Sequence, residues 1–506
     1  MHSLIAFTAW LSLGQSLTSA QTQVFLPRAP DSLVAATSTL RPWLSKDARI
    51  VFPSKEEWAE LQIRGSSPRI SPNYNVVVEV ATEADVEKTV QIAGHYGIPF
   101  LAVSGTHGWA ITLNNLPFGI QINMRKLNST TVDPRGKTAT VGGGTLQHEV
   151  TRALYAKNKQ AVTGLCECVS VIGPLMGGGH SMLQARHGYA LDNIVSARVV
   201  LANGTAVTAS ETKNLDLFWA VRGAGHNFGI VTSMVLNVYD VQNWTAYVLI
   251  FTQDKIEKLF SLVNEVDAQP SRPSNMFLTG TGVRISDIDA KNPVIAYTLG
   301  FEGTEQEAAP WVAPFQALGP AVTQVATDVD YISLHTVTQN NLESTTCRRN
   351  LNIVGNGASL PSWNMSALRN AYNIFGELTA DSRFNTSVFL LENYGMEGVE
   401  AVDASSTALA LEERLYPVLT SPVIWWEGND TQTTADAYAY GEKIRAALFA
   451  GMGKAKKHTY VNYAIGTESF EQIYGYEDWR VKKLKSLKRK LDPKNRFGYY
   501  NPVPAV

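Results

Sequence analysis

A glycine-rich stretch from Gly164 to Val231 constrains the fold of this chain more than any other feature. It contains the run Gly177-Gly178-Gly179-His180 and ends in the segment that begins Arg222-Gly-Ala-Gly. Glycine loses backbone entropy in regular structure, so such a cluster indicates tight turns or a backbone that lies close to a ligand. Cys166, near the start of the stretch, adds a reactive thiol. Glycine content alone leaves a turn-rich β region as the competing interpretation.

A second loop, residues 104–108, points to a ligand. It follows an apolar run at 98–103, whose length and composition predict a short buried strand. Upstream, residues 75–80 predict another strand, and Thr82 with Asp85 three residues later predicts the start of a helix. The order strand, helix, strand puts the loop at a strand end, where α/β units bind ligands.

The two segments together resemble the flavin-binding half of the berberine-bridge-enzyme-like oxidases. That family lies within the vanillyl-alcohol-oxidase superfamily and binds FAD in a PCMH-type domain. The resemblance covers residues 72–231 and resumes at 460–502. It implies that FAD is bonded through its 8α-methyl group to His107 and through its C6 atom to Cys166. The expected cofactor-binding residues are His107, Cys166, Ser104, Gly105, Thr106, Gly108, Val169, Gly173, Gly177, Gly178, Ile230, Val231 and Asn462.

Each attachment residue also has a plainer interpretation. A lone histidine is more often a hydrogen-bonded core residue, and a lone cysteine is often a small buried apolar residue. The presence of both at matching positions favours attachment. The chain departs from the family pattern at Val103, which replaces arginine, and at Thr106 and Ser170, which replace glycine. We expect Thr106 to add bulk beside the flavin ring, and the small Val169 to leave room for O2.

The expected fold class is α+β: a two-part PCMH-type FAD-binding domain with an antiparallel-sheet substrate domain inserted before a C-terminal return segment. Residues 1–20 are expected to form a signal peptide. Residues 21–66 are expected to form an N-terminal arm that is extended up to Pro53. The FAD-binding domain is assigned to 67–240. Strands interleaved with helices over 241–454 predict one antiparallel sheet covered on one side, and 455–506 should return to the FAD-binding domain.

The charge balance and the N-terminus limit the function classes. A net charge of −2 gives no basis for binding nucleic acid or a membrane surface. The apolar run Leu4–Leu13 is too short to span a bilayer and precedes small residues at 18–20, so we expect secretion. A disordered or buried N-terminal segment is the alternative. Six Asn-x-Ser/Thr sequons agree with secretion and are the expected N-glycan sites: Asn128, Asn203, Asn243, Asn364, Asn385 and Asn429.

The cysteines and histidines limit the chemistry further. The three cysteines, Cys166, Cys168 and Cys347, are an odd number, so at least one of them does not form an intrachain disulfide. Attachment of FAD at Cys166 would leave the other two either free or paired. The histidines lack a metal-binding spacing, so no metal site is expected.

The run Tyr460-Val461-Asn462-Tyr463 matches the family's Tyr-x-Asn-Tyr motif and makes Tyr463 the expected catalytic base. An unperturbed tyrosine has a pKa of about 10, so its pKa would have to be lowered for this role. His180 is the second expected catalytic residue and the expected hydrogen-bond partner of the phenolate. The alternation in this run predicts a strand. If Tyr463 only packs over the ring, the base is His180, Glu392 or Tyr394.

The resemblance implies that a substrate C–H bond is oxidised by hydride transfer to FAD, after which O2 accepts the electrons and forms H2O2. The run Cys166-Glu167-Cys168-Val169 resembles the fungal subgroup associated with secondary metabolism, which favours an alcohol or a polyketide- or alkaloid-like substrate. One alternative is a carbohydrate oxidase with an open groove of exposed aromatics, for which Trp425-Trp426 is the candidate pair. Another is a secreted, allergen-like binding protein that keeps the flavin without useful turnover.

Overall fold

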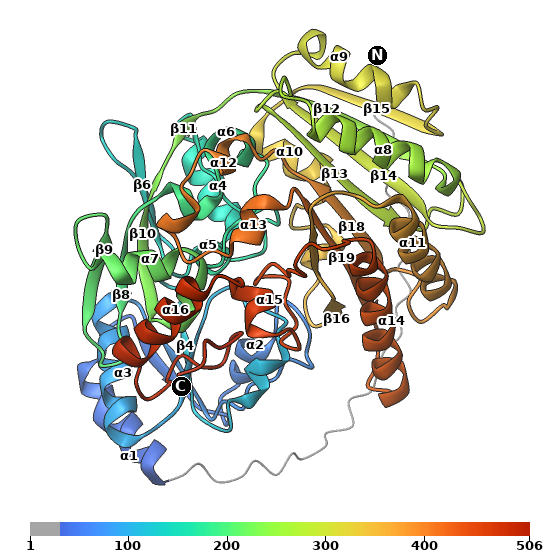
Figure 1. The fold of residues 1–506 in the computed structure, drawn as a ribbon. Coiled ribbons are helices and arrows are strands. Elements are labelled where there is room, and N and C mark those ends of the chain that lie inside the picture. Colours follow the sequence, from blue (N-terminus) through green and yellow to red (C-terminus); the bar gives the residue numbers. More distant parts are fainter. Residues whose placement is uncertain (1–30, 506) are drawn as a thin grey trace.

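The computed structural model describes residues 31–505, so the signal peptide predicted at 1–20 lies outside the described residues. Figure 1 shows one half of the molecule built around two smaller sheets and another half built on one large sheet. Within residues 31–505, no helix combines the length and the apolar character that a membrane span requires.

The first sheet presents the His107 loop at the end of one of its strands. Its strands lie in the order β1-β2-β4-β3, with β2, β4 and β3 parallel. Helix α3 (Glu83–Tyr96) connects β2 to β3 and begins, as predicted, with a capping box between Thr82 and Asp85. The strands are β1 (Arg49–Val51), β2 (Val76–Glu79), β3 (Phe100–Val103) and β4 (Ile120–Asn123).

The N-terminal arm is not extended over residues 31–53, contrary to the prediction. Helix α1 (Asp31–Leu40) packs on α3, and β1 pairs with β2. The cause is a buried stripe of Leu33, Ala36 and Leu40, whose spacing puts all three on one helix face. The four-stranded sheet therefore takes its first strand from the segment assigned to the arm.

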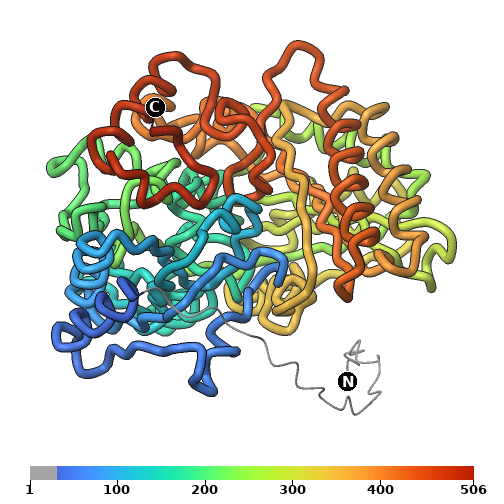
Figure 2. The backbone as a smooth tube through the Cα atoms, turned by 90° about the horizontal axis from the view of Figure 1, so that it is seen from below, coloured from blue at the N-terminus to red at the C-terminus, as the bar shows by residue number. Residues whose placement is uncertain are grey.

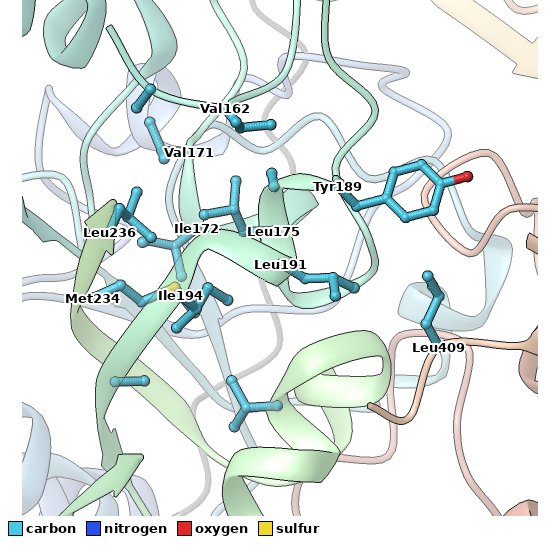
Figure 3. Packing of buried hydrophobic residues seen from close by; sticks show 14 of the residues in the cluster. Val162, Val171, Ile172, Leu175, Tyr189, Leu191, Ile194, Met234, Leu236 and Leu409 are labelled. Atoms are coloured by element: carbon cyan, nitrogen blue, oxygen red, sulfur yellow. The ribbon is translucent and has the colours of Figure 1, made fainter. Parts of the chain in front are cut away.

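A five-stranded antiparallel sheet completes this half, in the order β5-β6-β10-β8-β9. The turn predicted at 202–205 joins β8 to β9 as a hairpin. Figure 3 shows how Ile172 and Leu175 of α5 pack near Met234 and Leu236 of β10. The elements are β5 (Thr130–Val132), β6 (Thr138–Gly142), β8 (Ile194–Val200), β9 (Ala206–Ser210), β10 (Ile230–Asn237), α4 (Gln147–Tyr155), α5 (Ile172–Met176) and α7 (Leu215–Ala224).

The antiparallel sheet predicted for the second half is present. Its strands lie in the order β15-β12-β14-β13-β18-β19-β16, and β17 also pairs with β19. Helices α8, α9, α11 and α14 cover one face of it (Figure 1). The strands are β12 (Trp244–Phe251), β13 (Met276–Val283), β14 (Val294–Glu302), β15 (Val322–Val329), β16 (Asn352–Gly355), β17 (Ala358–Leu360), β18 (Val388–Asn393) and β19 (Val418–Trp426), and the helices are α8 (Ile256–Asp267), α9 (Glu305–Gln316), α11 (Met365–Ala380) and α14 (Thr431–Ala450).

Alternation along the strands gives this sheet two different faces. On β19, Ile424 and Trp426 pack in the core beneath the helices, whereas Val423 and Trp425 line a cavity on the opposite side. Trp425 and Trp426 are only 4% and 2% exposed. The pair is therefore not the exposed aromatic groove that a carbohydrate oxidase was expected to have.

The C-terminal segment returns to the half that contains the two smaller sheets, where α16 (Asp478–Leu491) packs on α7. Figure 2 shows this red part of the chain lying along the half that is coloured blue to green. Lys488 holds the C-terminal segment in place, because its Nζ donates to Asp492 Oδ2 at 2.7 Å and to the Asn227 carbonyl at 3.0 Å. Arg496 then donates from Nη1 to the Ala202 carbonyl. These contacts hold the C-terminal segment against this half of the molecule.

Candidate active site

A cavity of about 410 Å³ lies where the two halves meet the C-terminal segment. Loops of the half with the two smaller sheets form one wall, the helix-free face of the large sheet forms the opposite wall, and residues 460–463 close part of it. The fold thus brings together residues from all three regions. Thirteen of the predicted site residues line the cavity: Ser104, Gly105, Thr106, His107, Gly108, Cys166, Val169, Gly173, His180, Ile230, Val231, Asn462 and Tyr463.

Gly177 and Gly178 were predicted to bind the cofactor, but they lie behind the cavity wall. A Cβ on Gly177 would lie 2.4 Å from Val461 Cγ1, and one on Gly178 would lie 2.9 Å from Tyr460 Cε2. Gly178 also has a φ of 140°, a conformation that favours glycine. These glycines let the C-terminal turn at 460–463 pack directly on the end of α5.

The loop after β3 packs directly on the cysteine segment. A Cβ on Gly105 would lie 2.7 Å from the backbone nitrogen of Ser170, so a larger residue would push the two loops apart. Thr106 adopts the left-handed φ of 57°, a backbone conformation that favours glycine. The Gly65 N–H donates to Thr106 Oγ1 at 2.8 Å and holds the side chain in place.

His107 is held as a neutral imidazole. Burial and the positive charges of Arg64 and Arg349 lower the pKa of His107 to about 4. Gly65 makes room for the ring, because a Cβ at that position would lie 2.5 Å from His107 Nε2. A neutral imidazole keeps one nitrogen lone pair, which a covalent bond to carbon requires.

Cys166 is the free cysteine, and Cys168 forms a disulfide with Cys347. Of the two arrangements left open by the sequence, the paired one is therefore correct. The Cys166 thiol lies 3.3 Å from Asn340 Oδ1. Burial and the negative charge of Glu392 raise the pKa of the thiol to about 12, so this group is a thiol at neutral pH.

The cysteine segment is attached to the half of the molecule that contains the large sheet at several points. Besides the disulfide, the Glu167 N–H donates to the Asn340 carbonyl at 2.9 Å. The Leu342 N–H donates to Glu167 Oε2 at 3.0 Å, and His335 Nδ1 lies 2.8 Å from the Leu165 carbonyl. The positions of the thiol and of Val169 therefore depend on both halves of the molecule.

Glu392, at the end of β18, binds two tyrosines in the cavity wall. Tyr463 donates to Glu392 Oε2 at 3.0 Å, and Tyr394 donates to Oε1 at 2.6 Å. Burial raises the pKa of Glu392, although the Tyr394 hydrogen bond and the nearby His180 oppose that shift. Burial and the charge of Glu392 raise the pKa of Tyr463 well above its usual value. The lowered pKa predicted for Tyr463 is thus absent, and Glu392 is the group beside it that can accept a proton.

Two expectations about the environment of Tyr463 were wrong. Residues 460–463 form a turn instead of a strand, in which the Tyr463 N–H donates to the Tyr460 carbonyl at 2.8 Å. The reason is tertiary: the Tyr460 hydroxyl accepts a hydrogen bond from the Gly179 N–H at 2.7 Å, and the chain must reverse there to reach the cavity. His180 does not hydrogen-bond to Tyr463, because its two ring nitrogens contact Glu413 and Gln184.

Comparison with known proteins identifies the cofactor. Residues 74–210 match the family model described as FAD binding domain. The FAD-linked oxidoreductase chyH of Penicillium rubens is 36% identical over 471 residues, which cover 91% of this chain and 92% of that protein. The FAD-linked oxidoreductase chry5 of Gibberella zeae is 35% identical over 483 residues, with 91% and 93% covered. The chain belongs to the FAD-linked oxidoreductase family.

Solved structures show the same fold as this FAD-linked oxidoreductase. The xylooligosaccharide oxidase from Myceliophthora thermophila C1, solved with xylobiose, has a TM-score of 0.80 and 22% identity, covering 93% of this chain and 99% of that one. The glucooligosaccharide oxidase from Acremonium strictum, which carries 6-S-cysteinyl, 8α-N1-histidyl FAD, has a TM-score of 0.79 and 20% identity over the same shares. The BBE-like 1 protein of Physcomitrella patens has a TM-score of 0.78 and 21% identity, with 93% and 99% covered.

The cavity residues of this oxidoreductase fit FAD. Ser104 Oγ, Trp109 Nε1 and His226 Nδ1 are buried without a hydrogen-bond partner among residues 31–505, and all three residues line the cavity. Buried polar atoms are normally paired, so these atoms indicate a polar ligand. Arg64, buried in the same wall, adds a positive charge that suits an anionic cofactor.

Sequence reasoning missed the residues that come from distant segments. Glu413 contacts both His180 and His458, and Asn340 contacts the Cys166 thiol. None of Glu413, His458 and Asn340 belongs to a recognisable motif. The one usable signal was in β18, where Val388, Leu390 and Glu392 alternate and all line the cavity. That alternation indicates a strand with two different faces, but it does not show what lies opposite the face that lines the cavity.

Proposed function

We propose that this FAD-linked oxidoreductase is a secreted oxidase that carries FAD on both His107 and Cys166. Its substrate is a small, largely apolar alcohol of the polyketide or alkaloid type, and O2 is the electron acceptor. One observation carries the choice of substrate: the wall opposite the flavin loops is apolar and ends in the Glu392–Tyr463 pair.

The apolar wall argues against a sugar. Sugar hydroxyls need hydrogen-bond partners, and each buried polar group left without one costs about 1–3 kcal/mol. Aliphatic side chains and one indole instead favour a hydrocarbon or aromatic skeleton. A carbohydrate oxidase is the second candidate, supported by the names of the solved relatives. The wall consists of Leu351, Ile353, Val388, Leu390, Leu419, Val423 and Trp425.

The Glu392–Tyr463 pair supplies the base. A substrate hydroxyl beside Tyr463 gives its proton to the phenol oxygen while Tyr463 passes its own proton to Glu392 Oε2, 3.0 Å away. A carboxylate whose pKa is raised by burial is a better proton acceptor than an exposed one. When bound, FAD would supply the hydride acceptor for the carbon that bears this hydroxyl, and O2 would be the final acceptor of the two electrons, giving H2O2.

Turnover distinguishes the candidate functions. The holoenzyme should produce H2O2 from hydrophobic primary or secondary alcohols and should be inactive or much slower with xylobiose and cello-oligosaccharides. Faster reaction with the sugars would support the carbohydrate oxidase. If neither the alcohols nor the sugars bleach the flavin, the third hypothesis is supported, namely a protein that keeps flavin without useful turnover.

Attachment of the flavin at two sites is supported by the neutral His107 and the free Cys166, which line the same cavity. After acid precipitation, the protein should stay yellow, and peptide mapping should find flavin on both residues. Cys166→Ala and His107→Ala should each retain flavin, and the double variant should release it. His187→Ala, a histidine outside the cavity wall, is the matched control. Release of all flavin from the unmodified protein would contradict the proposal.

Secretion is supported by surface features. The asparagines of all six sequons are exposed, so each is accessible to glycosylation: Asn128, Asn203, Asn243, Asn364, Asn385 and Asn429. The Cys168–Cys347 disulfide is typical of proteins that fold in an oxidising compartment. Expression of the full chain in a fungal host should deliver a protein to the medium whose mass falls on endoglycosidase treatment. An unglycosylated protein retained inside the cell would contradict it.

A further inference from the structure

A buried cluster of ionisable groups lies directly behind the cavity wall. Glu413, on helix α13 (Leu411–Leu415), bridges two histidines from distant parts of the chain. His180 Nε2 lies 2.6 Å from Glu413 Oε1, and His458 Nε2 contacts Oε2. The side chains of Glu413 and His458 are each 1% exposed, and that of His180 is 7% exposed. His180 lines the cavity, whereas the other two residues lie behind it.

The hydrogen bonds around His180 determine where its protons lie. Gln184 Oε1 accepts a hydrogen bond from the Ser181 N–H at 3.2 Å, while its Nε2 donates to the Gly395 carbonyl at 3.2 Å. The amide orientation is therefore known, and the His180 Nδ1, 3.1 Å from Gln184 Oε1, must donate. Because Nδ1 already carries a proton, a second proton on Nε2 makes the ring a cation beside Glu413.

The other half of the cluster agrees with this assignment. His458 Nδ1 is buried without a partner among residues 31–505, so a proton there would be unpaired, and a neutral ring that donates from Nε2 is favoured. Ser359 Oγ also donates to Glu413 Oε2, at 3.3 Å. Burial opposes the ionisation of Glu413, but the hydrogen bonds from His180 and His458 outweigh it and lower the pKa of Glu413 to about 2.

Helix α13 is fixed rigidly enough to hold this geometry. The Tyr189 hydroxyl donates to the Glu413 backbone carbonyl at 2.7 Å. The next residue, Arg414, forms a buried ion pair with Asp192 at 2.6 Å. The carboxylate of Glu413 is thus positioned from both the main chain and the neighbouring side chain.

The face of His180 turned toward the cavity meets mainly phenols and one carboxylate. Its ring centroid lies 4.8 Å from that of Tyr460 and 5.7 Å from that of Tyr394, which itself binds Glu392. A positive charge on His180 acts on Glu392 to lower its pKa. The titratable groups that face His180 are Glu413 from α13, Glu392 from β18, and Tyr189, Tyr394 and Tyr460.

We propose that Glu413 is a positioning residue that keeps His180 doubly protonated, so that a permanent positive charge stands in the cavity wall beside the Glu392–Tyr463 pair. The charge keeps Glu392 ionised and ready to accept the substrate proton. This inference rests on the proposed role of Glu392 and Tyr463. It also gives His180 a different task from the one predicted, because His180 acts on the base through its charge and makes no hydrogen bond to Tyr463.

The first test measures protonation directly. Holoenzyme labelled with nitrogen-15 in its histidine rings contains nine histidines, and the His180 signals are identified by their loss in His180→Gln. Both His180 nitrogens should show the chemical shifts of a doubly protonated imidazolium ring at neutral pH. A neutral His180 ring would overturn the inference. This measurement needs neither a substrate nor a Glu413 variant.

The second test removes the charge and keeps the hydrogen bonds. In Glu413→Gln the side-chain amide can donate to His180 Nε2 and accept from His458, so His180 should become neutral. Loss of the positive charge raises the pKa of Glu392, so the acid limb of the flavin-reduction rate should move to higher pH by about one unit. At a pH on that limb, reduction should be about tenfold slower.

Glu412→Gln is the matched control, because it removes a buried carboxylate from the same helix that lies near Gly475 instead of His180. It should leave the His180 signals and the pH profile unchanged. An unchanged profile in Glu413→Gln would overturn the inference. If Tyr463→Phe reduces its flavin at the normal rate, the proposed role of Tyr463 in the function fails, but the nitrogen signals of the unmodified holoenzyme still decide the charge on His180.

Discussion

The two walls of the cavity are built in different ways. The flavin-side wall consists of loops whose residues are close in sequence, such as Ser104–Gly108, with exposed backbone and unpaired polar atoms. The opposite wall takes one or a few residues from each of several strands, and almost all of them are apolar. The first wall suits a cofactor with many polar atoms, whereas the second suits a substrate with few. We therefore expect that a substitution in the second wall can alter substrate choice while cofactor binding is kept.

Removal of the Tyr463 hydroxyl is the largest expected perturbation of this arrangement. Tyr463→Phe should keep the flavin spectrum, because the flavin-side wall is untouched, but lower the rate of flavin reduction by about 10²–10⁴-fold. Stopped-flow reduction under anaerobic conditions measures it. Tyr394→Phe, which removes the other phenol on Glu392, is the matched variant and should have a smaller effect. A wild-type rate in Tyr463→Phe would remove this residue from the mechanism.

The Cys168–Cys347 disulfide is the covalent link between the two walls, so its removal tests whether they depend on each other. The Cys168→Ser/Cys347→Ser double variant should lose about 2–5 kcal/mol of unfolding free energy, because the bond closes a loop over a sequence separation of 179 residues. Denaturant unfolding measures the loss. We also expect less flavin bonded to Cys166, since the segment is no longer held.

Each single variant is the control for the disulfide, because breaking the bond from either side should destabilise the protein to the same extent. An unchanged unfolding midpoint in the double variant would show that hydrogen bonds such as that from Glu167 to Asn340 suffice to join the walls.

The contrast between the walls also explains what could be predicted from the sequence. The capping box at Thr82 and the hairpin at 202–205 depend on neighbouring residues, and both were predicted correctly. The His107 and Cys166 loops have short motifs, and the fold brings both to one cavity. The cluster of His180, Glu413 and His458 joins three distant segments, so no local pattern could reveal it.

Local patterns also failed where tertiary packing overrode them. The Ser- and Thr-containing segment before Pro53 forms helix α1 because Leu33, Ala36 and Leu40 find a buried partner in α3. The motif at 460–463 alternates like a strand but turns, because Tyr460 is held by the Gly179 N–H. In both places the deciding contact lies far away in the sequence.

Introducing a polar side chain into the apolar wall tests the proposed substrate class. Leu390→Asn changes the polarity at nearly constant size, so it should lower kcat/KM for a hydrophobic alcohol by about 10- to 100-fold. The flavin spectrum and the fraction of attached flavin should stay unchanged, because Leu390 belongs to the sheet wall. Leu390→Met is the conservative control and should remain close to wild type. An improvement with oligosaccharides and no loss with alcohols would favour the carbohydrate oxidase.

The smallest expected effect concerns Val169, which belongs to the flavin-side wall and whose small side chain is expected to leave room for O2. Its backbone is fixed on both sides: its N–H donates to the Cys166 carbonyl at 3.1 Å, and its carbonyl accepts from the Gln147 N–H at 2.8 Å. Val169→Leu should therefore add bulk to the cavity without moving the loop. We expect flavin reoxidation by O2 to slow by about tenfold, which corresponds to about 1.4 kcal/mol of barrier, with reduction by substrate unchanged. Stopped-flow measurement of both half-reactions separates these effects, and Val169→Ala should reoxidise at least as fast as wild type.

Equal slowing of both steps in Val169→Leu would mean that Val169 shapes the substrate space, and no slowing would mean that O2 reaches the flavin by another route.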